Sequence, residues 1–434
     1  MKKIGFAAIA ILVFSSWCFG LQTVDGMLED ALVLNRHDLS SPNLAQLIET
    51  ERCTVGNSFN AENVISSKDF KINNSNLRLY AALPLDSHPM VKKSAIFVSA
   101  DKNSSIFCAK PDVKSIDINT DASIIKLGYG ARVSDYLDLG IGINQSSVKI
   151  EDNRTLGYSY GIRFLPFKAF SIEYSDEKIS ANNLTNINYG EELLGSQSGG
   201  GSKDNSIDKT EIAATFKPGS KLAFRGFLGR NKNGESVKVD ANSERYFYLR
   251  VDRTAYYGGV GVEIIQEKFS YGLDLIGSET NISSDGGLFA LFPSDLMAGD
   301  ALIDKTGDVA AKMKVGGFRI SMKNSESNRL RINGALSCLK VLFDGDAKIW
   351  DSLFFGMARR LDAQYVIPVE SADVLVGSLA ARFIINKNYE INYSVQQMVP
   401  ISVVQRAQGN GPSEETPSSA SGGNIQTFAV ACYF

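Results

Sequence analysis

The chain has 434 residues and a nearly balanced charge, with 45 Lys and Arg against 48 Asp and Glu and a pI near 5.7. This balance provides no basic surface for nucleic acid, so no nucleic-acid partner is expected. The five cysteines are too few for a disulfide scaffold in a chain of this length. Cys338 and Cys432 occupy apolar strand positions, and whether Cys53 and Cys108 pair with each other stays open.

The first twenty residues have the pattern of a secretory signal peptide. Lys2 and Lys3 precede an apolar run, and Cys18 and Gly20 supply small residues where a signal peptidase cuts. The apolar run is shorter than the roughly 20 residues that a membrane-spanning helix needs. We therefore expect residues 1–20 to be a cleaved signal peptide and the mature protein to be exported.

Residues 21–90 differ in pattern from the rest, and we expect them to form a short, partly helical N-terminal segment. Val24–Leu34 and Asn43–Ile48 have the apolar spacing of helices, and Ser40-Ser41-Pro42 is a suitable start for the second helix. Asn76–Leu83 has the pattern of a strand. Two interpretations remain open: a periplasmic extension that carries some early strands, or a plug that folds back into a barrel.

The start of this segment resembles the fatty-acid transporter family of bacterial outer-membrane barrels. Gly20-Leu21-Gln22 is similar to the Gly-aromatic-Gln opening of that family. The Asn-Pro-Ala motif that the family carries further on is absent, and Ser41-Pro42-Asn43 stands in its neighbourhood. The resemblance implies a plugged transporter of hydrophobic compounds.

From Ser123 onward, apolar and polar residues alternate with a period of two. In the first run, Ile125, Leu127 and Tyr129 share one face, whereas the intervening positions are Lys126 and Gly128. Such alternation indicates a sheet with one face in lipid and one in water. Short connections alternate with long polar loops at 179–208, 231–254, 281–308 and 400–423. This is typical of a single-chain outer-membrane β-barrel.

Counting the runs predicts about 16 strands, with a range of roughly 14–18. Fourteen runs follow Ser123. The alternation of connections requires one earlier strand, and Ser352–Val369 exceeds the roughly 9–11 residues of one spanning strand, which indicates a hidden hairpin. We therefore predict an all-β fold, a transmembrane antiparallel β-barrel over residues 91–434. A barrel of this size usually encloses an aqueous lumen.

The two histidines, His37 and His88, both precede the predicted barrel. Outer-membrane hydrolases of the phospholipase and omptin kinds need a histidine at the barrel rim as a base, and the sequence offers none there. It also has no cluster of His or Cys with the spacing of metal ligands. We therefore expect no enzymatic activity, no metal site and no cofactor.

Charged residues on the polar faces of the strands are the main candidates for function. A Lys or Arg that faces lipid at mid-depth costs about 2–4 kcal/mol, so these side chains are expected to point inward. Since the predicted barrel is too wide for side chains to fill, we expect them to line a pore. The predicted pore-lining residues are Lys126, Arg132, Arg163, Glu173, Arg225, Lys312, Lys314, Arg331, Arg382 and Glu390.

The loop Gly286–Asp300 contains apolar residues that an exposed loop usually lacks. One hypothesis is that it folds into the barrel and narrows the pore, with Asp295 and Asp300 opposite the basic wall; porins resemble this arrangement. The alternative is that Leu288 and Phe289 pack against neighbouring loops.

The last eleven residues, Asn424–Phe434, have the pattern of a strand that ends on an aromatic residue. Phe428, Val430 and Phe434 lie on one face together with Cys432. This segment resembles the final strand of bacterial outer-membrane barrels, and the resemblance implies recognition by the barrel-assembly machinery. If the barrel closes, we expect this strand to pair with an early strand within Ser94–Asp121.

The sequence thus favours a porin-like channel in the bacterial outer membrane that passes small hydrophilic solutes by diffusion. A plugged transporter of hydrophobic compounds is the first alternative, and a structural or adhesive surface barrel is the second. The expected partners are outer-membrane lipid, the assembly machinery and small solutes. Whether the protein forms a homo-oligomer stays open.

Overall fold

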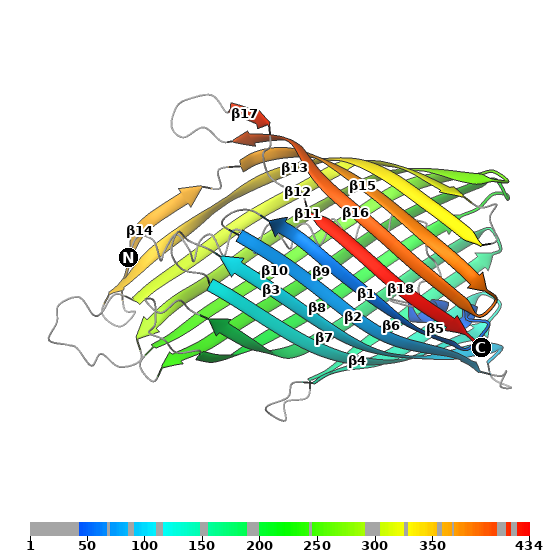
Figure 1. Ribbon diagram of the computed structural model, residues 1–434, viewed down its shortest axis with the longest axis horizontal. Helices are drawn as coiled ribbons and strands as arrows, with labels where there is room; N and C mark the ends of the chain where they lie inside the picture. Colours follow the sequence, from blue (N-terminus) through cyan, green and yellow to red (C-terminus); the bar gives the residue numbers. More distant parts are fainter. Residues whose placement is uncertain are drawn as a thin grey trace.

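The period-two alternation produces one antiparallel sheet that closes on itself, which the computed structural model shows as a barrel of strongly tilted strands (Figure 1). The structure describes residues 43–434 apart from 67–69, 86–90, 110–115, 148–154, 189–198, 243–244, 291–303, 325–328, 354–357, 367–368, 406–413 and 418–422. The predicted signal peptide, the expected helix at Val24–Leu34, and Asp295 and Asp300 of the predicted constriction loop lie outside these residues.

One short 3-10 helix, η1 (Leu44–Glu49), precedes the strands. Among the described residues, no helix is long and apolar enough to cross a membrane. In chain order the strands are β1 (Thr54–Ser66), β2 (Phe70–Leu85), β3 (Lys93–Ala109), β4 (Ile116–Ser134), β5 (Leu137–Ser147), β6 (Thr155–Phe167), β7 (Phe170–Asn188), β8 (Gly199–Phe216), β9 (Leu222–Asn242), β10 (Arg245–Ile265), β11 (Phe269–Ala290), β12 (Asp304–Asn324), β13 (Leu330–Leu353), β14 (Ala358–Val366), β15 (Val369–Asn386), β16 (Tyr389–Gln405), β17 (Glu414–Pro417) and β18 (Asn424–Tyr433).

The barrel wall consists of sixteen strands, as predicted. The sheet contains eighteen, but β14 pairs only with β13 and β17 only with β16. Without these two short strands, each remaining strand has a neighbour on both sides, and β1 pairs with β18. The fold class is therefore confirmed: a closed antiparallel barrel with almost no helix.

The predicted start of the barrel at residue 91 is wrong, because β1 and β2 lie before it. Strand β1 was missed, and Asn76–Leu83 of β2 was recognised as a strand but placed in the N-terminal segment. Both sequences are rich in Asn and Ser, which weakens the alternation in hydrophobicity. The hairpin predicted within Ser352–Val369 is present, since Leu353 at the end of β13 lies opposite Ala358 of β14, but it does not add a strand to the wall. This region holds the end of β13 and the short β14, whereas β13 pairs with β15 over the rest of its length.

Several connections predicted as long loops are strands that continue past the apolar part of the wall. Strands β9 and β10 pair from Leu222 and Ile264 almost to their tips, so most of the predicted loop 231–254 is a hairpin. Likewise, Gly286–Ala290 of the predicted constriction loop belongs to β11. In Figure 1, β14 and β17 lie at one end of the barrel, and the C-terminus and η1 lie at the other, the short-turn end.

The last strand closes the barrel with β1, not with a strand in Ser94–Asp121 as predicted. Thr54 lies opposite Tyr433, Phe59 lies opposite Phe428, and the Phe434 amide donates to the Cys53 carbonyl at 2.8 Å. Phe428 and Phe434 are 45% and 71% exposed and share one face, as the alternation predicted, and this face points outward. Cys53 is a free thiol at the short-turn end, whereas Cys108 lies near the far end of β3, so the two cannot pair.

The outer face of the wall carries a broad apolar surface. Ile141, Leu228 and Leu275 are 64%, 67% and 57% exposed, and inward neighbours such as Asn144, Phe227 and Asp274 are buried. A continuous exposed apolar surface of this kind belongs in a lipid bilayer, where a closed barrel leaves no strand edge unpaired.

The closure can be tested with one cysteine pair. Val55 lies directly opposite Cys432, and both side chains face outward. Cross-strand Cα atoms about 4.5–5.5 Å apart fall within disulfide range. Val55→Cys is therefore expected to form a disulfide with Cys432 under mild oxidation, measured as the loss of two alkylatable thiols by mass spectrometry. Val98→Cys on β3 serves as the control and should stay reduced. A disulfide with Cys432 in the Val98→Cys variant and none in the Val55→Cys variant would mean that β18 pairs with β3.

Candidate functional site in the barrel interior

The short helix η1 occupies the inside of the barrel at its short-turn end. Asn43 caps it, because its Oδ1 accepts a hydrogen bond from the Ala45 amide at 3.1 Å. Ala45, Leu47 and Ile48 are 0%, 0% and 1% exposed, which is unusual for so short a segment. The apolar spacing of Asn43–Ile48 predicted a helix here, and the structure confirms it as a 3-10 helix.

Glycines on the inner faces of β4, β5 and β6 form the surface on which η1 lies. A Cβ atom at Gly128 would lie 2.5 Å from Leu44 Cδ2, and one at Gly140 would lie 2.5 Å from the Ala45 nitrogen. Additions at Gly130, Gly142 and Gly161 would also collide with residues 43–47. We call these five glycines the glycine seat. They leave the wall smooth enough for a backbone to approach it closely.

Apolar contacts hold the other side of η1. Leu44 and Leu47 belong to a buried cluster with Tyr80 and Ala82 of β2 and Ala95 and Phe97 of β3. The side chains of this cluster come from the inner faces of β2, which the sequence analysis assigned to the N-terminal segment, and of β3, which it placed in the barrel. The segment is thus packed on the wall over β2–β6.

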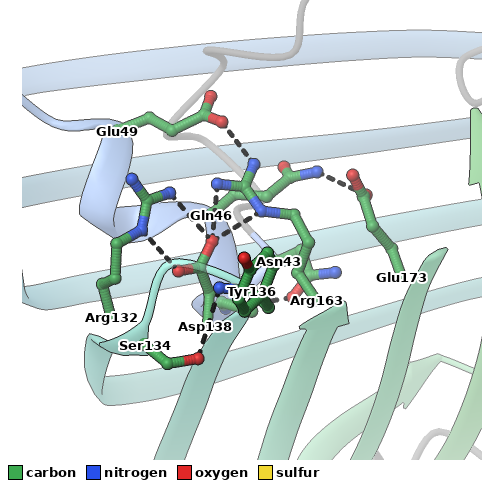
Figure 2. A network of polar contacts seen from close by, with 10 residues as sticks. Asn43, Gln46, Glu49, Arg132, Ser134, Tyr136, Asp138, Arg163 and Glu173 are labelled. Carbon is green, nitrogen blue, oxygen red and sulfur yellow. Dashed lines mark hydrogen bonds and ion pairs between the residues drawn. The ribbon is translucent and has the colours of Figure 1, made fainter. Parts of the chain in front are cut away.

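A polar network fixes the same segment to the wall (Figure 2). Asp138 is fully buried and accepts hydrogen bonds from two guanidinium groups: Arg132 Nε at 2.8 Å and Arg163 Nε at 2.9 Å. Arg163 also binds Glu49, and Gln46 Nε2 donates to Glu173 Oε2 at 2.6 Å. Charge-assisted, two-pronged contacts of this kind are stronger than neutral hydrogen bonds.

Most of the predicted pore-lining residues face inward, and several of them form ion pairs within the wall. Lys126 contacts Glu177 at 2.7 Å, and Arg382 binds Glu390, which also accepts from Tyr433 Oη at 3.2 Å. Arg225 lies over the ring of Phe227, with 5.7 Å from Cζ to the ring centroid. Arg331 faces inward opposite Arg382 in register. Together with Arg132, Arg163 and Glu173, eight of the ten predicted positions are inward.

The prediction is wrong for Lys312 and Lys314, which face outward. Inward positions of β12 are Met313, Val315 and Arg319, which are 4%, 4% and 1% exposed, and the lysines alternate with them. Both lysines contact Glu279, which is also outward on β11. They lie beyond the apolar part of the strand, where a lipid-facing charge costs only about 0–1 kcal/mol. The rule that charges point inward holds only within the apolar belt.

The inner wall of β8–β16 is apolar over a large area, which the sequence analysis did not predict. Inward side chains from neighbouring strands form one buried cluster, with Phe343 and Val403 packed against it: Ala213, Phe227, Tyr257, Ile276, Met313, Val315, Leu339, Val341, Ala372, Val374, Val376 and Met398. We call this cluster the apolar inner wall. It runs against the expectation of a polar lumen, since a water-filled barrel carries polar residues inside.

A polar row borders the apolar inner wall on its short-turn side. Asp274 of β11 lies in register opposite Arg319 of β12, and Arg225 of β9 lies opposite Gly261, next to Asp274. Asp274 and Arg319 are 7% and 1% exposed. The interior therefore changes along its length from charged pairs near η1 to the apolar inner wall, and beyond it to polar side chains such as Arg253, Thr280 and Ser284, which are 6%, 1% and 5% exposed. No group of His, Cys, Asp and Glu that suits a metal ion occurs among the described residues.

Removing the carboxylate that joins two arginines tests the polar network. Asp138→Asn is expected to lower the free energy of unfolding by about 3–5 kcal/mol, because it leaves the buried Arg163 with an incompletely compensated charge. Denaturant titration of the detergent-solubilised protein would measure this. The control is Asp135→Asn, which breaks an exposed contact to Lys92 and should cause no measurable change. Equal effects of both substitutions would show that Asp138 does not act as a buried ion-pair centre.

Filling the glycine seat tests the placement of η1. Gly140→Ala puts a methyl group where Leu44 and Ala45 lie, so η1 is expected to leave the wall while the barrel stays folded. A thiol reagent should then label Leu47→Cys several-fold faster than in the unsubstituted background. Gly377→Ala, with no heavy atom within 4 Å of the added Cβ, should leave the labelling rate unchanged. Slow labelling in the Gly140→Ala background would place η1 elsewhere.

No protein-family profile and no curated protein sequence matches this chain. Among solved structures, the chain is similar to a Pseudomonas aeruginosa FadL homologue at 10% identity, with a TM-score of 0.42 and 93% of this chain and 95% of that chain covered. It is similar to the CymD monoaromatic hydrocarbon channel at 8% identity and a TM-score of 0.40, over 92% and 93% of the chains. It is also similar to the translocator domain of the autotransporter NalP from Neisseria meningitidis at 7% identity and a TM-score of 0.40, over 98% and 99%. Similarity at this level carries no argument about function, which must be drawn from the side chains of the interior.

Proposed function

We propose that the protein is a bacterial outer-membrane transport barrel for small apolar or amphipathic molecules, with η1 as a gate at its periplasmic end. The observation that carries the proposal is the apolar inner wall. Apolar solutes partition favourably onto such a surface, whereas a hydrophilic solute gains nothing from it.

The direction of insertion follows from the connections. Outer-membrane barrels have short periplasmic turns and longer extracellular connections. The two-residue turns after β4 and β15 lie at the same end as the C-terminus and η1. We place this end in the periplasm, in keeping with the predicted signal peptide. Recognition of Phe428, Val430 and Phe434 by the barrel-assembly machinery is part of the same proposal.

The inward charges support a gate rather than a wide polar pore. Arg132, Asp138 and Arg163 satisfy one another and also hold Glu49 of η1. A charge paired in this way is less available to a passing hydrophilic solute. We infer that the network's role is to hold η1 reversibly, and that a solute arriving along the apolar inner wall leaves when η1 moves off the glycine seat.

Flux through the purified protein in liposomes tests the proposed substrate class. Val315→Thr, Val341→Thr and Val376→Thr together add three hydroxyl groups to the apolar inner wall at nearly constant volume. Because burying an unpaired hydroxyl costs about 1–3 kcal/mol, flux of an uncharged aromatic dye should fall by at least about tenfold. Val260→Thr, which faces outward and is 60% exposed, is the control and should have no effect.

The same liposomes distinguish the proposal from a porin. A hydrophilic dye of equal size should permeate much more slowly than the aromatic dye through the unsubstituted protein. Faster passage of the hydrophilic dye, together with large steady conductance steps in a planar bilayer, would favour the diffusion porin and contradict the proposal.

A further inference from the structure

Cationic side chains appear on the outer face of the barrel where the apolar belt ends. On β9 the outward residues run from Phe224 and Leu228 to Arg230 and Lys232. On β12 they run from Met322, Ile320 and Phe318 to Lys314 and Lys312. On β13 the outward Lys340 follows Leu336 and Cys338 and lies one outward position before Leu342, the last apolar residue of the belt on this strand. In each strand the charge begins on the side away from the short turn.

The register of the sheet brings these positions together. Glu279 of β11 lies between Tyr256 of β10 and Lys314 of β12, and Tyr256 lies opposite Arg230 of β9. Lys340 lies opposite Gly316, one outward position from Lys314. We call Arg230, Lys232, Lys312, Lys314 and Lys340 the basic band. Its cations lie on β9, β12 and β13, on either side of β10 and β11, near the edge of the apolar belt.

The band has more cations than nearby carboxylates. Arg230 contacts Asp208 at 3.3 Å, and Lys312 and Lys314 contact Glu279 at 2.5 and 3.9 Å. Asp208 also lies opposite Lys232, and Asp344 lies opposite Lys312, so the five cations of the band lie beside the carboxylates of Asp208, Glu279 and Asp344. These side chains remain partly open to solvent: 45% for Arg230, 40% for Lys312 and 55% for Lys314. Hydrogen-bonding groups of Thr254 and Asn281 lie on the same outward face, between the cations of β9 and those of β12.

The band is confined to one side of the barrel. Among described side chains at outward positions of β1–β7, β15, β16 and β18, the cations are Lys102 on β3 and Lys178 on β7, on separate strands. Adjacent strands lie about 4.8 Å apart, so the β9 cations and the β12 cations are separated by roughly 14 Å along the wall. Two separated groups of cations above an apolar surface suit a lipid with an extended, multiply charged headgroup.

We propose that the basic band binds the phosphate groups of a phosphorylated glycolipid of the outer leaflet, with the acyl chains lying on the apolar belt below it. The position of the band meets both requirements of such a lipid: cations at headgroup depth and apolar side chains directly beneath. The inference rests on the outer-membrane placement proposed above but not on transport. A test of lipid binding therefore stays separate from a test of flux.

Native mass spectrometry of the detergent-solubilised protein, titrated with diphosphorylated lipid A, tests the proposal. Each cation near an anionic lipid surface contributes roughly a factor of five in affinity, so Lys312→Gln, Lys314→Gln and Lys340→Gln together should weaken binding on the order of a hundredfold. The matched control, Lys102→Gln with Lys178→Gln, should bind as the unsubstituted protein does. Circular dichroism would verify that each variant keeps its strand content.

A substitution that is expected to strengthen lipid A binding separates a specific effect from a loss of folding. Glu279→Gln removes the carboxylate that competes for Lys312 and Lys314 and should tighten lipid A binding several-fold. Lipid A without phosphates should bind weakly to every variant. The proposal is overturned if the triple variant binds as tightly as the unsubstituted protein, if the Lys102→Gln and Lys178→Gln control loses as much affinity, or if the phosphate-free lipid binds equally well.

Discussion

The pairing of β1 with β18 is the interaction on which the rest of the structure depends. In a bilayer every backbone N–H and C=O must find its partner within the protein, and a sheet meets that demand only when it closes. The ten-residue ladder from Thr54–Tyr433 to Asn63–Asn424 completes the closure. Once it has formed, successive side chains along each strand point alternately to the lipid and to the interior. The outer apolar belt, the apolar inner wall and the basic band all follow from this alternation in the closed sheet.

Closure also creates an interior whose contents are determined by the side chains that point inward. Near the short-turn end, the wall carries glycines instead of bulky residues, and η1 fits onto them. The buried Asp138 then neutralises two arginines, one of which reaches Glu49 of η1. Farther along the barrel, the inner wall of β8–β16 turns apolar. A charged, occupied end next to the apolar inner wall describes a gated path for apolar solutes better than an open polar pore.

The sequence predicted what depends on short-range periodicity. The alternation after Ser123 and the shared face of Phe428 and Phe434 were both correct, as was the number of strands. Two of the strands that make up this number were assigned wrongly, because Asn and Ser weaken the alternation in β1 and β2. The alternation also placed Gly128 on the polar face of its strand, which is the inner face of the barrel.

What the sequence missed depends on depth in the membrane and on contacts between distant residues. Lys312 and Lys314 were expected inside, because the pattern of a strand does not show where its apolar belt ends. Gly161 and Ala45 are neighbours only in the folded barrel, so no local signal marks the glycine seat. The apolar inner wall was hidden for a related reason: a run such as Val374–Val376 is apolar on both faces, and alternation alone then assigns neither face to the interior.

The central claim is that η1 must leave the glycine seat for a solute to pass. A disulfide between Ala45→Cys and Gly161→Cys tests it directly, because a Cβ at Gly161 would lie 3.4 Å from the Ala45 Cβ. This spacing suits a disulfide once the Asn43 side chain moves aside. Flux of the aromatic dye should stop in the oxidised protein and return on reduction. Equal flux in both states would contradict the account.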